Sequence, residues 1–219
     1  DYWEYGLMYT DYGLGISHKG AYVLRNEMGK YVELKEESIG APDIYLGGKL
    51  REVELDNGNK AWAFGSSQYV HAAVENVETY LRTRHMQLPT QAKAPLKTDY
   101  RPELDVTPEL SPHDASHYQS LIGILRWTVE LGRADICVEV SMMSSHLALP
   151  REWHLLAVYN IFAYMKSHHN AEMVFDPTEP EINHSAFERK DWTTSEMGFN
   201  LTEPLPTNMP EPRGFGHVC

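Results

Sequence analysis

The clearest potential for chemistry lies in one short stretch, Tyr9-Thr10-Asp11-Tyr12. The apolar runs on either side of it, residues 5–9 and 14–17, predict a β-hairpin with Asp11 at its tip. A carboxylate held at the end of a strand is suited to bind a hard divalent cation. The alternative is an ordinary solvated aspartate in a turn.

Eleven histidines suggest metal binding as a second kind of chemistry. His113 and His117 stand four residues apart with Asp114 between them, so one helical face would carry two imidazoles. The sequence offers no third ligand at a suitable spacing, which favours ordinary surface positions. It also lacks a G-x-S-x-G elbow and a G-x-x-x-x-G-K-[ST] phosphate loop, so hydrolase and P-loop chemistry are unsupported.

The composition is that of a chain able to bury a core. At 219 residues and 42% apolar content, it has room for one large domain or two small ones. Its two cysteines, Cys137 and Cys219, are far apart and indicate neither a disulfide framework nor a zinc ribbon. No signal peptide and no apolar run of membrane-spanning length is visible, so we expect a soluble intracellular protein without membrane contact.

The charge balance bears on nucleic-acid binding. A net charge of −12 argues against strong binding, because phosphate contacts require lysine and arginine. A modest basic stripe is still available in the middle of the chain, from Arg82, Arg84, Lys93, Lys97 and Arg101.

The elements that would position these residues begin with strands around one helix. Leu24, Met28 and Tyr31 recur at helical spacing and predict a helix over 19–31. Two strand-like runs follow, 43–55 and 60–64, separated by Asn57-Gly58. That dipeptide is the strongest short signal for a tight hairpin turn, because both turn positions need positive φ.

The remainder of the chain predicts helices. Ser66-Ser67 would cap a helix reaching about residue 84, and three more helices follow over 112–132, 135–149 and 153–168, the second capped by Asp135. Together the last three predict a compact antiparallel bundle. The five prolines of residues 85–112 exclude long regular elements and favour a solvated linker over a functional loop. A short strand at 173–175 would precede a flexible tail.

Five stretches taken together resemble the reverse transcriptases of copia-type LTR retrotransposons. Tyr9-Thr10-Asp11-Tyr12 is similar to the Tyr-X-Asp-Asp hairpin of that family, and the resemblance continues through 39–49, 66–80, 118–136 and 149–165 in the family's order. It covers most of residues 1–176. It implies an α+β fold, in which a partial right-hand polymerase palm of antiparallel strands plus a helix is followed by a helical thumb and connection bundle.

The same resemblance implies a division of the chain. Residues 1–65 would be the C-terminal part of the palm, and 66–110 the thumb helix with a Pro-rich linker. Residues 111–176 would be the helical connection bundle, and 177–219 a tail leading toward an RNase H domain. The fingers and an early palm strand of the family would lie outside this sequence.

By resemblance, Asp11 is the catalytic residue and a ligand of Mg²⁺. Tyr12 stands where the family carries a second carboxylate, and a phenol with a reference pKa of about 10 is neutral at pH 7. Two-metal phosphoryl transfer needs several carboxylate oxygens to hold both cations. We therefore expect a damaged metal site and no polymerase activity from this chain alone.

A primer contact is implied for Tyr45, Leu46, Gly47, Gly48 and Lys49, which resemble the family's primer grip. The two glycines would let the backbone approach a sugar–phosphate chain, and Lys49 could meet a phosphate. The alternative is a glycine-bearing bulge in an exposed hairpin. The implied partner is an RNA/DNA primer–template, bound weakly given the net charge. The competing hypothesis for the whole chain is a non-catalytic relic or a protein-interaction module based on the helical bundle.

Overall fold

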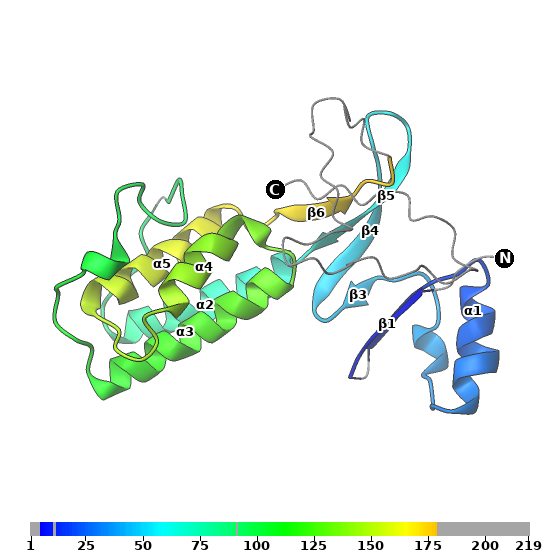
Figure 1. Ribbon diagram of the computed structural model, residues 1–219, viewed down its shortest axis with the longest axis horizontal. Coiled ribbons are helices and arrows are strands. Elements are labelled where there is room, and N and C mark those ends of the chain that lie inside the picture. The colour runs from blue at the N-terminus through cyan, green and yellow to red at the C-terminus, as the bar shows by residue number, and fades with distance from the viewer. Residues whose placement is uncertain (1–4, 11, 91, 179–219) are drawn as a thin grey trace, which may run out of the picture. The chain divides into compact units, whose positions relative to one another are not determined.

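The structure is a computed structural model that describes residues 5–10, 12–90 and 92–178, except for the side chain of Ser38. Its internal contacts divide the chain into residues 1–177 and 178–219, and the fold described here is that of the first unit. Asp11 and nearly all of the tail lie outside the described residues. The remainder is mixed α and β, with antiparallel sheets and helices (Figure 1).

The first hairpin forms where the sequence predicts it. Strands β1 (Tyr5–Tyr9) and β2 (Tyr12–Ile16) pair antiparallel, with Tyr9 opposite Tyr12 and Thr10 at a φ of 52° in the turn. Both strands are largely exposed. The predicted helix follows as α1 (Gly20–Tyr22), which continues into a π-helical turn (Val23–Glu27) and a 3-10 turn (Met28–Lys30). The place of the helix is correct, but its geometry is irregular.

The second sheet has the order β3-β4-β5-β6, all antiparallel. Its strands are β3 (Ile44–Tyr45), β4 (Gly48–Glu54), β5 (Lys60–Gly65) and β6 (Glu172–Phe175). The prediction of one continuous strand over 43–55 is wrong. Leu46 and Gly47 take φ angles of 52° and 89° and turn the chain between β3 and β4. A leucine rarely adopts positive φ, so the sequence pattern gives no warning of this turn.

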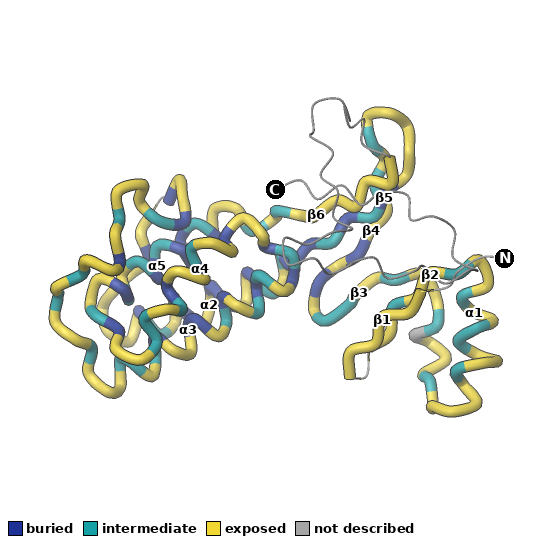
Figure 2. Tube along the Cα trace, viewed as in Figure 1, coloured by how far each residue is buried: buried dark blue, intermediate teal, exposed yellow. Residues whose placement is uncertain are grey.

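Helices carry most of the core. They are α2 (Ser67–Thr83), α3 (Pro112–Glu130), α4 (Cys137–Ser144) and α5 (Glu152–Ser167), and Figure 2 shows buried positions concentrated in them while β1 and β2 are exposed. The start of α3 is as predicted, since the Asp114 amide donates to the Ser111 hydroxyl at 3.2 Å. Fully buried side chains from three helices meet in the interior: Val70, Tyr118, Leu125, Val158, Ile161 and Phe162.

Helix α4 differs from its prediction in length and in cap. It spans Cys137–Ser144 rather than 135–149, and its N-cap position is Ile136. Asp135 does not cap it, because its carboxylate accepts two hydrogen bonds from the Arg133 guanidinium, at 2.8 and 2.7 Å. The carboxylate therefore neutralises a buried charge instead of satisfying helix amides.

The Pro-rich stretch before α3 is not a solvated linker, and that interpretation is wrong. Leu88 and Ala92 within it are buried, and the side chain of Asn160 donates to the carbonyls of Ala94 and Pro95 at 3.0 and 2.7 Å. Side chains of α5 thus take over the hydrogen bonding that a regular element would supply. The prolines exclude helices and strands here, but not order.

Candidate nucleic-acid interface

The structure brings the first hairpin next to the Tyr45–Lys49 segment. The ring of Tyr12 lies edge-on to the ring of Tyr45, with centroids 6.2 Å apart at 85°. On the other side of the turn, the ring of Tyr9 lies next to the ring of Trp127 in α3, with centroids 6.3 Å apart. Two predicted site regions, whose contacting residues are 33 positions apart in the sequence, therefore meet. The side chain of Asp11 itself is not described.

Glycine is required at Gly47 and at Gly48 for two different structural reasons. A Cβ at Gly48 would lie 2.2 Å from the ring of Phe64, so only glycine fits beneath that ring. Gly47 has open space around it but a φ of 89°, which side chains rarely adopt. The tight turn accounts for one glycine and ring packing for the other. Neither needs a bound backbone to explain it, and the bulge that served as the alternative is a two-residue turn.

Beside this turn lies a hollow of about 450 Å³, which we call the β3–β4 hollow. From the turn it is lined by Ile44, Gly47 and Lys49, and from the start of α2 by Ser67, Gln68 and His71. Asp43, Gly65 and Glu172 complete its wall. Lys49 is exposed and faces the same space as the first turn of a 17-residue helix.

The charges around the β3–β4 hollow are mixed but favour an anion on one side. The N-terminus of α2 carries a partial positive charge, and no side chain caps it because the Ser66 hydroxyl is buried without a hydrogen-bond partner. Glu172 is already paired, accepting from the Arg51 guanidinium at 3.0 Å. That hydrogen bond, together with the charge of Arg51, lowers the pKa of Glu172 against the effect of burial. Asp43 remains as a carboxylate that would oppose an anion.

Sequence reasoning missed the α2 side of this hollow. Ser67 and His169 are hydrogen bonded at 2.8 Å, and the ring of His169 packs against that of His71 at a tilt of 41°, with centroids 4.2 Å apart. His169 follows α5, about a hundred residues after Ser67, so only tertiary structure brings them together. The one usable signal was the position of Ser66-Ser67, directly after a strand and at the start of a strongly amphipathic helix.

The predicted basic stripe does not assemble at this hollow. Arg84 is committed elsewhere, because it forms an ion pair with Asp114 at 2.7 Å and lies over the Tyr80 ring at 4.9 Å. Lys97 and Arg101 line a different hollow, at the far end of α2 and beside α5. Of the predicted cations, none joins Lys49 in lining the β3–β4 hollow within the described residues.

The described residues do not fit a metal centre. Among them, no group of three or more His, Cys, Asp or Glu side chains is placed to hold an ion. The His113 imidazole faces Arg84 and Asp114, and His117 hydrogen bonds to the Tyr159 hydroxyl at 3.1 Å. His113 occupies the expected surface position, whereas His117 is half-buried and contacts the neighbouring helices. Because Tyr12 packs on Tyr45 and offers no carboxylate, no metal-dependent step is assigned.

No helix in the described part of the chain combines the length and apolar character needed to cross a bilayer. No protein-family model and no solved structure matches the chain. The chain is similar to "Putative transposon Ty5-1 protein YCL074W" of Saccharomyces cerevisiae, with 28% identity over 143 residues. The match covers 65% of this chain and 41% of that protein, so the chain spans less than half the length of this curated relative. This similarity supports a transposon-derived origin.

Proposed function

We propose that the chain is the late palm, thumb and connection part of a copia-type reverse transcriptase, an RNA-directed DNA polymerase. Its own role is to hold the sugar–phosphate backbone of an RNA/DNA primer–template. Residues 1–65 are the palm part, 66–110 the thumb helix with the Pro-rich stretch, and 111–176 the connection. The transposon-derived origin and the order of the resembling segments support this assignment.

The observation that carries the proposal is the contact between Tyr12 and Tyr45, which joins the hairpin of Asp11 to the Tyr45–Lys49 turn. In a polymerase, the growing strand end must lie next to the catalytic hairpin, and a backbone contact must fix it there. Lys49 and the uncapped start of α2 offer a cation and backbone N–H groups for phosphate at the rim of the β3–β4 hollow.

Binding is weak and catalysis is absent in this proposal. One lysine and one helix terminus neutralise few phosphates, and the net charge of −12 repels the remainder of the nucleic acid. With Tyr12 in place of a second carboxylate, Asp11 and Mg²⁺ alone do not meet the requirements of two-metal phosphoryl transfer. Primer extension by the isolated chain is therefore expected to give no product.

The test is the affinity for a fluorescent primer–template, measured by anisotropy over a series of salt concentrations. Lys49→Gln removes one phosphate contact, so the slope of log affinity against log salt should fall by about 0.9. The control is Lys60→Gln, which removes the same charge at the opposite end of the same hairpin, where Lys60 lies opposite Glu54 in the sheet and forms an exposed ion pair with Glu52 at 3.3 Å.

Equal losses in the two variants would mean that binding is a general effect of charge and would refute a contact at Lys49. An affinity independent of salt would refute a phosphate contact, and no affinity at low salt would favour the relic or the protein-interaction module. Mg²⁺-dependent primer extension by the chain would refute the absence of catalysis.

A further inference from the structure

A second hollow, of about 650 Å³, lies on the outer side of α5. We call it the α5 hollow and define it by four apolar residues, Met86, Leu104, Trp153 and Leu156, with Lys97 and Arg101. Its walls come from the N-terminal half of α5 and from the irregular stretch between α2 and α3. Its volume falls within the range of about 300–1,000 Å³ that is typical of ligand sites.

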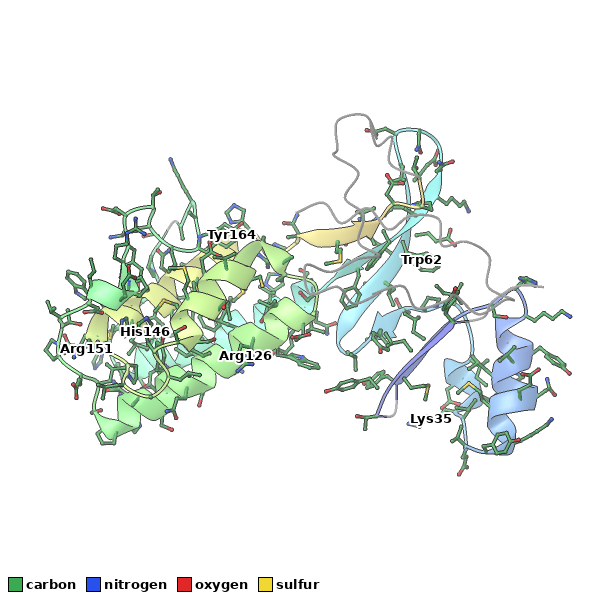
Figure 3. The ribbon with its side chains drawn as sticks, in the orientation of Figure 1. Lys35, Trp62, Arg126, His146, Arg151 and Tyr164 are labelled. Atoms are coloured by element: carbon green, nitrogen blue, oxygen red, sulfur yellow. The ribbon has the colours of Figure 1, made fainter. Side chains whose placement is uncertain are left out.

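Buried polar side chains hold the irregular wall in place. The backbone N–H of Arg151 donates to His154 Nδ1 at 3.0 Å, so the proton of this imidazole is on Nε2, which donates to the Pro102 carbonyl at 3.0 Å. The Arg151 side chain donates to the Thr107 carbonyl, and Arg151 and His146 lie at the same end of the helices in Figure 3. The hollow is therefore pre-formed, which reduces the entropy lost when a partner binds.

The mouth of the α5 hollow is apolar and exposed. Trp153 is 56% exposed, Leu156 51% and Leu104 70%, although the opposite face of α5 is fully buried. The solvent-exposed face of a surface helix ordinarily carries polar side chains. A contiguous group of exposed tryptophan, leucine and methionine around a concavity is typical of an interaction surface.

The accessible charges at this mouth are mainly positive. Lys97 and Arg101 face it with one exposed carboxylate, Asp99. The carboxylate of Asp105 is not accessible at the mouth, because its side chain is fully buried. It accepts hydrogen bonds from the Thr107 amide and hydroxyl at 2.8 and 2.7 Å. Among the described residues, no ion pair forms on Lys97 or Arg101. The sign of the charge is thus locally reversed in a chain of net charge −12.

We propose that the α5 hollow docks an acidic peptide segment of a partner protein, which inserts bulky apolar side chains over Trp153 and Leu156. The carboxylates of that segment pair with Lys97 and Arg101. The exposed side chains of Leu104 and Leu156 widen the apolar mouth of the hollow, so an extended or helical segment covers more of it than a small molecule would. Of the aromatic residues in the lining, Trp153 is exposed, whereas Tyr159 is buried and Tyr100 half-buried. A single exposed ring suits leucine or phenylalanine anchors better than successive stacked nucleobases, because such bases need several planar aromatic platforms.

The experiment selects random peptides displayed on phage against the full chain and measures the enriched peptides by fluorescence anisotropy. We expect sequences that combine large apolar residues with Asp or Glu. Trp153→Ala should weaken binding by about tenfold, as expected for a central aromatic anchor. The matched control, Leu149→Ala, removes another exposed apolar side chain outside the hollow and should leave affinity unchanged. A Lys97→Gln/Arg101→Gln variant should weaken binding of the acidic peptides and abolish its salt dependence.

Several results would overturn the proposal. One is enrichment on a Trp153→Ala/Leu156→Ala variant equal to that on the unmodified chain. A second is a set of enriched peptides that is basic or lacks apolar anchors. A third is displacement of the peptides by single-stranded DNA whose own binding is lost in Trp153→Ala, which would assign the hollow to nucleic acid. Thermal unfolding of each variant confirms that exposed positions were changed without loss of fold. The result does not depend on the polymerase assignment, since Lys49 has no part in it.

Discussion

Arg133 is among the largest fully buried side chains, with 1% of its surface exposed, and Asp135 holds its charge. Burial by itself would raise the pKa of Asp135, but the hydrogen bonds and charge of Arg133 lower it below its usual value. The third guanidinium nitrogen, Nη1, is buried without a hydrogen-bond partner among the described residues. The fold around the start of α4 therefore depends on one carboxylate.

Replacing that carboxylate should be costly. Asp135→Asn leaves the guanidinium buried without a counter-charge, and we expect a loss of about 3–5 kcal/mol in the free energy of unfolding. The measurement is urea denaturation followed by circular dichroism. As a control, Glu109→Gln removes the partner of Arg151 at 3.5 Å in an exposed pair and should cost less than about 1 kcal/mol.

A combined Arg133→Met/Asp135→Leu variant separates the pair from its surroundings. Recovery of most of the lost stability would show that the cost of Asp135→Asn is the unpaired charge. A loss of less than about 1 kcal/mol in Asp135→Asn would contradict the dependence on this carboxylate.

At this scale the sequence predicted residue types better than residue roles. The contact between Tyr12 and Tyr45 is found only in the tertiary structure, whereas the turn around Thr10 follows from the hairpin pattern. The role of Gly48 does not, because the Phe64 ring that requires it comes from another strand. Aspartate is a common N-cap residue, but both carboxylate oxygens of Asp135 accept hydrogen bonds from Arg133 instead. The contacts of Asp11 lie outside the described residues, and its role stays a prediction.

Strand β4 begins with a glycine that has no room for a larger residue. Gly48→Ala would place a Cβ 2.2 Å from the Phe64 ring, and the ring must move from a packed position. Overpacking of this kind costs about 1–3 kcal/mol, and we expect that loss in thermal or urea unfolding. The double variant Gly48→Ala/Phe64→Leu should recover part of it. A Gly48→Ala variant of unchanged stability would mean that the ring moves freely.

His117 connects three helices, and its titration should make the bundle sensitive to mild acid. Its imidazole stacks on Tyr80 of α2 at 3.7 Å and hydrogen bonds to Tyr159 of α5. Burial, with the charge of Arg84, lowers the pKa of His117, while Asp114 opposes the shift. His146 has a lowered pKa as well, through burial and the nearby His154.

A lowered histidine pKa means that the unfolded chain binds a proton more readily than the folded chain. The contribution of His117 to stability is therefore complete above the ordinary histidine value of about 6.5 and is lost as pH falls below it. We expect the free energy of unfolding to decrease as the pH falls below about 6.5, before the carboxylates titrate. His117→Gln should reduce this slope, and an unchanged slope in urea titrations would exclude His117 as its source.

The helices were predictable because their signals are local. Ser111-Pro112 marks the start of α3, and apolar spacing marks the buried faces of α2 and α5. The turn at Leu46-Gly47 and the order in residues 85–111 were not predictable in this way. Both depend on partners far along the chain, such as Asn160 for the carbonyls of Ala94 and Pro95.

Across the first unit, stability is concentrated in the helices. The core cluster draws on α2, α3, α4 and α5, whereas the first hairpin exposes large apolar side chains. The most exposed of them in β1 and β2 are Tyr5, Leu7, Met8 and Ile16. A two-stranded hairpin with little buried surface is marginal by itself.

Hydrogen exchange should display this contrast. Amides of β1 and β2 should exchange close to the rate of local opening, and those in the centres of α2, α3 and α5 should require global unfolding. Mass spectrometry of peptides from residues 5–16 and 118–129 measures both in one sample. Equal protection of the two regions would contradict the concentration of stability in the helices.

The pairing of β5 with β6 brings the two ends of the helical part together. These strands are neighbours in the sheet, yet the entire helical group from α2 to α5 lies between them in sequence. Its first and last residues are side by side, as the hydrogen bond between Ser67 and His169 shows. A module whose two ends are adjacent can be moved as a single cassette or circularly permuted, because closing its ends needs only a short link. The helical part of this chain therefore has the adjacent ends that circular permutation requires.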